Sequence, residues 1–284
     1  MLKKIRSLIY QHAIPAAFIV FVLLKLIIMG LGQLFSLLPQ SMPMAYIIEG
    51  ILMIVPAAFV CLFGFSSAFK KGSFFRGLLC CLPFIVMQLF SLFLFLSVNL
   101  RNPETNWKPW YLIIYGVFSI VGVGVREECL YRATIQNIVA KKHANSVKGI
   151  WITVIVSSII FGLTHATNLF FGMDPRAVLA QVISSAALGL LFGAVYLRSG
   201  SLWALILIHT LTDIAGLASS TFLRISDIED LNQMSGAWSL PLGVIFKWLI
   251  YIGLTAFLLR PSKCKQIRES LCFKDEESKA DIIE

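Results

Sequence analysis

Long apolar runs are the feature that most constrains how this chain of 284 residues folds. Runs of about 17–25 apolar residues are long enough to cross a bilayer as helices. The sequence contains about eight of them, over residues 14–38, 44–67, 77–99, 111–140 with a break, 149–170, 176–197, 202–220 and 241–260. Because 58% of the residues are hydrophobic and 14% are charged, a soluble domain and a disordered chain are both excluded. We therefore predict an all-α, polytopic transmembrane helix bundle of about eight spans.

The basic residues predict how the bundle is oriented. If the N-terminus is cytoplasmic, 18 lysines and arginines lie in inside segments and 4 in outside segments, namely Arg101, Lys108, Arg176 and Arg224. Basic loops stay in the cytoplasm, so both termini are expected there. This placement also explains the net charge of +9 without a nucleic-acid partner. The chain is expected to be a multi-pass protein of the cell membrane, with one integral domain over 1–260 and a cytoplasmic tail over 261–284.

Four ionisable side chains interrupt the fourth apolar run. They are Arg126, Glu127, Glu128 and Arg132. Charged groups are costly in hydrocarbon and by default mark a functional site. On a helix Glu128 and Arg132 share a face, whereas Glu127 points about 100° away. We predict that Glu128 pairs with Arg132 and that Glu127 is the freer carboxylate.

The same run is longer than the hydrocarbon layer is thick, so it needs a break, kink or tilt. The glycines Gly116, Gly122 and Gly124 precede the glutamates and are the predicted places for it.

Two histidines and an aspartate lie at a similar depth in other spans. Counted from the basic cytoplasmic ends, Glu127 is roughly 21 Å deep, His165 roughly 25 Å, His209 roughly 16 Å and Asp213 roughly 22 Å. A single intramembrane histidine is often a packing residue. Two histidines at the depth of paired carboxylates favour a common site, with a motif-bearing core over about 110–220.

Such a group of residues supports hydrolysis of an amide bond by either of two routes. A glutamate and a histidine can deprotonate water, while the second histidine and its neighbour stabilise an oxyanion. Alternatively, Glu127, His165 and His209 could hold a zinc ion with an open position for water. The sequence leaves the cofactor undecided.

A further charged residue, Lys25, lies near the middle of the first apolar run. We interpret it as a lysine that snorkels or binds a carbonyl group, rather than as a catalytic residue.

Three motifs on separate spans resemble those of a known family. Glu127-Glu128-x-x-x-Arg132, Phe161-x-x-x-His165 and His209-x-x-x-Asp213, in this order, are similar to the motifs of the CPBP intramembrane proteases. That family includes the type II CAAX prenyl endopeptidases and the bacterial Abi, or bacteriocin-immunity, proteins. The resemblance covers about residues 110–220.

The resemblance implies a glutamate-dependent intramembrane endopeptidase acting on a membrane-embedded or lipid-modified peptide. Glu127 would activate water with His165, His209 and Asp213 would stabilise the oxyanion, and Glu128 with Arg132 would order the first motif. Asp213 stands where the eukaryotic enzymes commonly have Asn. An ionised aspartate cannot donate a hydrogen bond, so Asp213 would have to be protonated or to orient His209.

Two other functions remain open from the sequence. One is a non-catalytic bacteriocin self-immunity or regulatory membrane protein built on the same scaffold. The other is a transporter with a proton-relay carboxylate, which the absence of a detectable internal repeat disfavours. The intact motifs favour the peptidase.

Overall fold

The computed structural model describes residues 2–39, 41–70, 72–224 and 242–270. In these ranges the chain is helical, apart from short connections and one isolated β-bridge between Trp107 and Leu223. The elements are α1 (Leu2–Gln11), α2 (Ala13–Ser36), α3 (Met42–Leu62), η1 (Ser66–Phe69), α4 (Phe74–Cys80), α5 (Leu82–Asn99), α6 (Trp110–Glu128), η2 (Cys129–Gln136), α7 (Asn137–His143), α8 (Val147–Leu163), η3 (Thr164–Phe171), α9 (Pro175–Ser199), α10 (Leu202–Gly216), α11 (Ala218–Phe222), α13 (Leu242–Leu258) and α14 (Pro261–Ser270).

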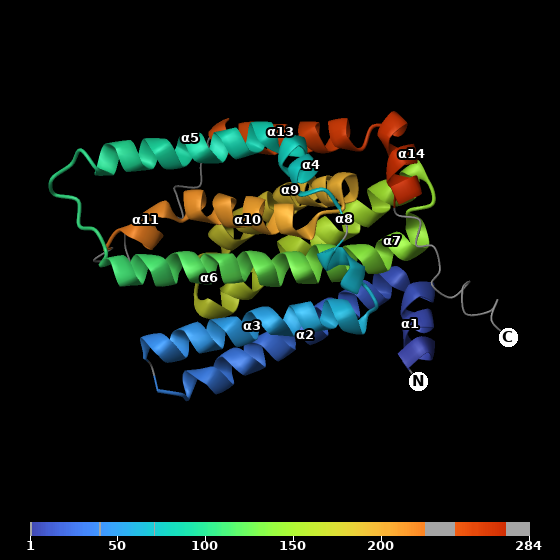
Figure 1. Cartoon of the computed structure of the whole chain (residues 1–284), viewed down its shortest axis with the longest axis horizontal. Helices are drawn as coiled ribbons and strands as arrows, with labels where there is room; N and C mark the ends of the chain where they lie inside the picture. Colours follow the sequence, from blue (N-terminus) through green and yellow to red (C-terminus); the bar gives the residue numbers. More distant parts are fainter. Residues whose placement is uncertain (1, 40, 71, 225–241, 271–284) are drawn as a thin grey trace.

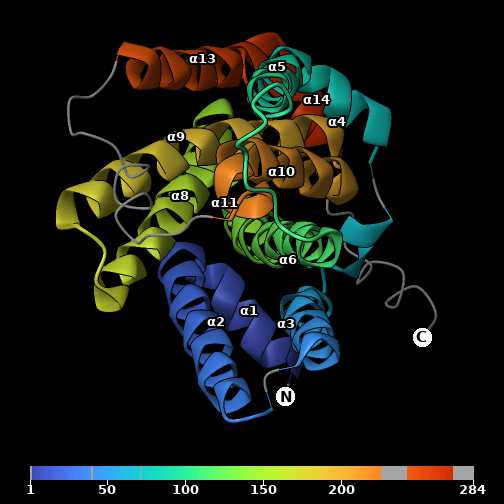
Figure 2. The same ribbon diagram turned by 90° about the vertical axis from the view of Figure 1, so that its left-hand side faces the viewer.

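The long helices lie side by side along the long axis of the molecule (Figure 1). Seen end-on, α6, α8, α9 and α10 occupy the middle, with α2 and α3 on one side and α5 and α13 on the other (Figure 2). The middle helices pack on one another, α8 against α9 and α6 against α10. The hydrophobic core therefore surrounds the segments that carry the three motifs.

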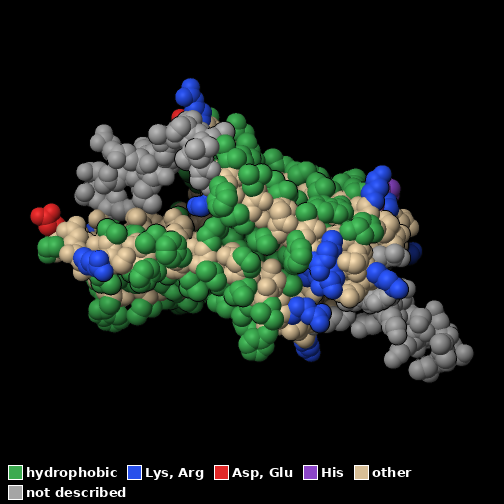
Figure 3. Space-filling view, turned by 90° about the horizontal axis from the view of Figure 1, so that it is seen from above, with side chains coloured by type: hydrophobic (Ala, Val, Ile, Leu, Met, Phe, Trp, Pro, Cys, Tyr) green, Lys and Arg blue, Asp and Glu red, His purple; other side chains and the backbone are tan. Residues whose placement is uncertain are grey.

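The outer helices present apolar side chains to their surroundings, as helices facing lipid do. Leu23 of α2 and Phe93 of α5 are more than half exposed. Hydrophobic side chains cover the flank seen in Figure 3, whereas basic side chains gather at the end of the molecule that carries α14. Five of the described helices are long and apolar enough to cross a membrane. The chain is an integral membrane protein.

The number of spans stays a prediction. Every one of the eight predicted ranges contains a helix, but the five helices that qualify by length and composition are Ala13–Ser36, Met42–Leu62, Leu82–Arg101, Val147–Phe171 and Pro175–Ser199. A bent pair, Val244–Leu258 and Pro261–Ile267, is a sixth candidate, with 66° between its two helices. Which end of the bundle is cytoplasmic is likewise untested.

The predicted tail begins as ordered structure. Residues 261–270 form α14, which packs against α8, and Cys264 and Ile267 are part of the core. The core therefore continues beyond residue 260. Residues 271–284, the rest of the predicted tail, lie outside the described residues.

The predicted break at the glycines of the fourth run is wrong. α6 continues unbroken through Gly116, Gly122 and Gly124, and the irregularity follows the glutamates as the π-helix η2. Within η2 the hydroxyl of Thr134 donates to the carbonyl of Cys129, five residues back. A π-helical turn inside an α-helix often accompanies a functional site.

Two of the three glycines serve close packing instead. A Cβ added to Gly122 would come within 2.3 Å of Glu49 Oε1, and one added to Gly124 within 2.9 Å of Thr210 Oγ1. The missing side chains let α6 approach α3 and α10 closely. This contact between helices is invisible in the sequence of α6 alone.

Capping residues set the start of the helices that carry the later motifs. The Ser146 hydroxyl accepts from the backbone N–H of Gly149 at the start of α8, and Ser201 accepts from Ala204 at the start of α10. Such caps satisfy backbone donors that have no partner within the helix. They fix where α8 and α10 begin, so α8 leads into η3, which carries His165, and α10 carries His209.

Candidate active site

The two glutamates at the end of α6 lie in different environments. Glu128 and Arg132 are fully buried and form an ion pair, with 3.2 Å between Arg132 Nε and Glu128 Oε2. The side chain of Glu127 is 22% exposed. The predicted pairing is confirmed, and Glu127 is the more accessible of the two carboxylates.

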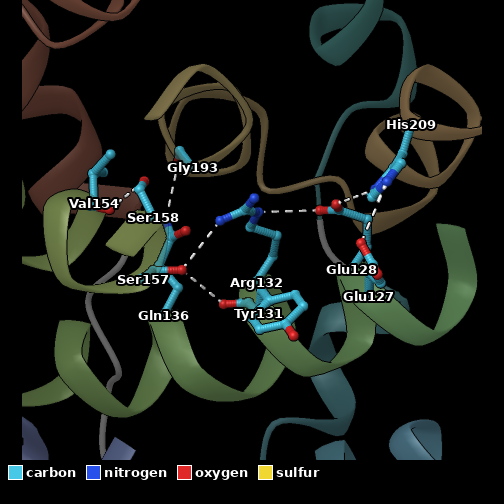
Figure 4. A network of polar contacts seen from close by, with 10 residues as sticks. All are labelled: Glu127, Glu128, Tyr131, Arg132, Gln136, Val154, Ser157, Ser158, Gly193 and His209. Atoms are coloured by element: carbon cyan, nitrogen blue, oxygen red, sulfur yellow. Dashed lines mark hydrogen bonds and ion pairs between the residues drawn. The ribbon is translucent and has the colours of Figure 1, made fainter. Parts of the chain in front are cut away.

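His209 of α10 joins the three predicted carboxylates. Its Nδ1 lies 2.7 Å from Glu128 Oε1, within hydrogen-bond distance. Its Nε2 lies 3.5 Å from Glu127 Oε2 and 3.5 Å from Asp213 Oδ2. Figure 4 shows His209 above the two glutamates, with contacts to both. Each nitrogen of this imidazole therefore faces carboxylate oxygen.

Asp213 lies one helical turn beyond His209, and 26% of its side chain is exposed. The exposed fractions of Asp213 and Glu127 contrast with the complete burial of Glu128 and Arg132. The site thus has a buried side, which orients His209, and an accessible side formed by Glu127 and Asp213.

Ser157 of α8 completes the buried side, and the sequence analysis missed it. Its hydroxyl accepts from Arg132 Nη1 at 3.1 Å and donates to the carbonyl of Tyr131 at 3.0 Å. Figure 4 shows the serine between these two groups. A sequence signal existed, because Ser157, Phe161 and His165 follow one another at intervals of four and share one face of a helix.

Phe161 lies at the centre of the aromatic contacts of the site. Its ring is 5.0 Å from that of Tyr131 and 5.9 Å from the imidazole of His209, measured between centroids. The guanidinium carbon of Arg132 lies 5.1 Å from the ring centroid, a cation–π distance. The ring therefore shields the ion pair of Glu128 and Arg132 from the side of α8.

His165, at the start of η3, contacts Phe161 with 5.8 Å between the ring centroids. Among the described residues it makes no hydrogen bond, and it interacts electrostatically with Lys25 and His209. The structure thus brings Glu127, Glu128, Arg132, His209 and Asp213 into direct contact. It places His165 beside this group, one aromatic ring away from His209.

A second ion pair lies next to the site on the side of α3. Arg126 Nη1 donates to Glu49 Oε1, and Glu49 is buried beneath Gly122. Arg126 and Arg132, which are among the 18 basic residues counted in inside segments, both form ion pairs within the bundle. Of the four charged residues between positions 126 and 132, both arginines have carboxylate partners. Glu128 is buried, and Glu127 is partly accessible.

Lys25 lies close to the charged residues at the end of α6. It is half-buried on α2 and interacts electrostatically with Glu127 and Arg126. Among the described residues it makes no hydrogen bond, so the predicted carbonyl partner is absent there. Lys25 lies beside the candidate site rather than apart from it.

The zinc alternative finds no support in the arrangement of the side chains. In the described ranges no three His, Cys, Asp or Glu side chains converge in a way that could hold a metal ion. Glu127 and His209 lie close together, but His165 is turned towards Phe161. We therefore derive no step through a metal.

Comparison with known families agrees with the geometry. The family model described as "Type II CAAX prenyl endopeptidase Rce1-like" matches residues 108–215. This segment is an Rce1-like domain. It begins just before α6 and ends within α10, so it includes all six predicted site residues. The Rce1-like family is a family of proteases that act on membrane-associated substrates.

Neither a search of curated proteins nor a search of solved structures found a match to this chain. The family match thus covers residues 108–215. The helices α1 to α5 and α13 to α14 flank this domain on two sides in the structure (Figure 2).

Proposed function

We propose that the chain is an intramembrane endopeptidase of the cell membrane that hydrolyses a peptide bond in a membrane-associated or lipid-modified peptide, with Glu127 as the general base. The observation that carries the proposal is the position of Glu127. Its carboxylate is partly accessible and lies 3.5 Å from His209 Nε2, whereas the carboxylate of Glu128 is buried and contacts both Arg132 and His209. Glu128 therefore has a structural role, and Glu127 remains available to act on a substrate.

Glu127 moves one proton twice during the reaction. A water molecule beside Glu127 gives its proton to the carboxylate while its oxygen bonds to the carbonyl carbon of the peptide. The π electrons of the carbonyl move to its oxygen, which becomes an oxyanion. When the C–N bond breaks, Glu127 returns the proton to the leaving nitrogen, which yields a carboxylic acid and an amine. General-base help of this kind contributes about 10²–10⁴ to a rate.

The buried side of the site keeps His209 in one orientation. Ser157 holds Arg132, Arg132 holds Glu128, and Glu128 accepts from His209 Nδ1 when that nitrogen carries a proton. His209 Nε2 is then directed at Glu127 and Asp213. A fixed imidazole next to the base costs no reorganisation during the reaction.

The role of Asp213 follows from the same geometry. Its carboxylate lies 3.5 Å from Nε2 of His209, on the accessible side. It is therefore a positioning residue for His209, rather than a hydrogen-bond donor to an oxyanion. Of the two roles that the sequence left open, orientation is the one that the distance supports.

The proposal is tested by following where the oxygen of water goes. Purified protein in lipid is incubated with fluorescence-quenched membrane peptides in water enriched in ¹⁸O, and the products are analysed by mass spectrometry. We expect one ¹⁸O in the new carboxyl group of the N-terminal product. Absence of any cleaved peptide would contradict the peptidase and favour a protein that only binds its peptide, as a bacteriocin-immunity protein does.

A further inference from the structure

The first two helices lie against the segment that follows the glutamates, α1 and α2 against α7 and α2 also against η2, and three contacts show the register. At the C-terminal end of α1 the ammonium of Lys141 in α7 lies 4.3 Å from the ring centroid of Tyr10, and Lys142 donates to the carbonyl of Gln11. Further along, the rings of Phe21 and Tyr131 are 6.4 Å apart. Residue numbers therefore rise along α1 and α2 in the direction in which they fall along α7 and η2, so the two segments are antiparallel.

This register predicts which residues meet at the next level. Lys25 follows Phe21 by four residues, and Glu127 precedes Tyr131 by four, so each lies on the same helix face as the residue already in contact. The next pair in the series is therefore Lys25 with Glu127. The electrostatic attraction between Lys25 and Glu127 agrees with this register, and the charge of Lys25 also acts, repulsively, on His165.

The other cationic groups around Glu127 already have carboxylate partners. These pairs are Arg126 with Glu49, Arg132 with Glu128, and His209 with Glu127, Glu128 and Asp213. Among the described residues Lys25 has no hydrogen bond and no ion pair. A cation in an apolar helix without such a partner is costly. Its ammonium is the one nearby cation with all three of its donors uncommitted in the described part of the chain.

The proposed reaction requires such a group. The oxyanion forms on the substrate beside Glu127, and hydrogen-bond donors directed at it lower the barrier. Asp213 is an acceptor when ionised, so it cannot complete a pair of oxyanion donors with His209. Among the side chains near Glu127 in the described ranges, Lys25 and His165 are the donors without a carboxylate partner.

We propose that Lys25 is a catalytic residue, whose ammonium donates a hydrogen bond to the oxyanion that forms on the scissile carbonyl. This inference rests on the proposed peptidase function and adds to it a residue from outside the Rce1-like domain. When the tetrahedral intermediate collapses, the electron pair returns from the oxygen to the carbonyl carbon. Lys25 keeps its proton throughout, so the balance of the reaction is unchanged.

The kinetic test compares Lys25→Met with a matched lysine. Lys247 lies in α13, another apolar helix, which packs against α9 away from the glutamates. We expect Lys25→Met to lower kcat by about 10²-fold or more, as loss of an oxyanion donor does, with KM changed by less than about threefold. Lys247→Met is expected to match the wild type. Unchanged kcat in Lys25→Met, or a raised KM at constant kcat, would overturn the assignment.

A small amine should replace the missing group. In Lys25→Ala, added ethylamine is expected to restore part of the lost kcat in proportion to its concentration, whereas it should leave the wild type and Glu127→Gln unchanged. A merely structural role of Lys25 would give no such rescue. Absence of rescue together with a normal melting temperature would count against the assignment.

A thermal measurement tests the placement of Lys25 independently of activity. The melting temperatures of Lys25→Met, Glu127→Gln and the double variant form a cycle, which we expect to deviate from additivity by about 2 °C or more. The cycle of Lys247→Met with Glu127→Gln should be additive. Additive shifts in the first cycle would overturn the placement of Lys25. Failure of the wild type to cleave any peptide would instead overturn the proposed function, so the two failures are distinguishable.

Discussion

Nδ1 of His209 lies 2.7 Å from Oε1 of Glu128, although the two residues are 81 positions apart in the chain. This contact links the first motif to the third. Because Glu128 is also paired with Arg132, it cannot turn away from His209 without breaking an ion pair. The consequences of this buried network can be tested residue by residue.

Removing Arg132 should destabilise the protein. In Arg132→Ala the buried carboxylate of Glu128 loses its cation, and breaking a buried ion pair costs about 3–5 kcal/mol. We expect a lower melting temperature in detergent and a lower protein level in the membrane. Arg132→Ala combined with Glu128→Gln should recover part of the loss, because the stranded charge is gone. A melting temperature equal to that of the wild type would show that the pair does not contribute to stability.

Ser157 and its neighbour Ser158 differ in the contacts of their hydroxyl groups, so substitution of Ser158 serves as the control for substitution of Ser157. Ser157 bridges Arg132 and the carbonyl of Tyr131, whereas the hydroxyl of Ser158 donates to Val154 within the same helix. Ser157→Ala leaves two buried groups short of a partner and should cost about 1–3 kcal/mol, with reduced kcat. Ser158→Ala should change stability by less than about 1 kcal/mol. Equal effects of the two substitutions in thermal unfolding would contradict the bridging role.

Contacts between residues of one helix could be predicted from the sequence, whereas contacts between helices depend on how the helices pack. The pair of Glu128 and Arg132 follows from their spacing on one helix, so it was predictable. The approach of His209 was expected from its depth in the membrane. The contact of its Nδ1 with Glu128, rather than with Glu127, depends on how α10 packs against α6.

Other features escaped prediction because they arise between helices. The break was expected at the glycines of α6, yet these residues let α3 and α10 approach, and the π-helical segment follows instead. The sequence interpretation of Lys25 did not connect it to the site, because Glu127, with which it interacts electrostatically, lies about 100 residues later in the chain. Ser157 looked like an ordinary polar residue of an apolar helix until the structure placed it next to Arg132.

Gly162 is predicted to be intolerant of a side chain. A Cβ there would lie 2.6 Å from the carbonyl oxygen of Val182 and 2.9 Å from Ala186 Cβ, where α8 crosses α9. Gly162→Ala should therefore separate the two helices, cost about 1–3 kcal/mol and displace His165. Gly253→Ala, whose added Cβ would meet no neighbouring segment within 4 Å, should be neutral or slightly stabilising. A melting temperature for Gly162→Ala equal to that of Gly253→Ala would contradict this tight contact.

Two substitutions of Asp213 test whether this residue orients His209 or acts through its negative charge. Asp213→Asn keeps an oxygen that can accept from His209 Nε2, whereas Asp213→Ala does not. If Asp213 orients His209, kcat should fall less than about tenfold in the first variant and about 10²-fold in the second. These rates are measured with the same quenched peptide. An Asn variant as inactive as the Ala variant would show that the negative charge itself is required.

The central claim is that Glu127 is the base, and its most direct test is peptide hydrolysis by Glu127→Gln beside the wild type, with and without a metal chelator. Glutamine preserves the size of the side chain but cannot accept the proton of water, so we predict a folded protein with kcat lowered by about 10²–10⁴-fold. Cleavage by the wild type should be indifferent to the chelator. Wild-type rates in Glu127→Gln would contradict the account, and so would cleavage that the chelator stops and added zinc restores.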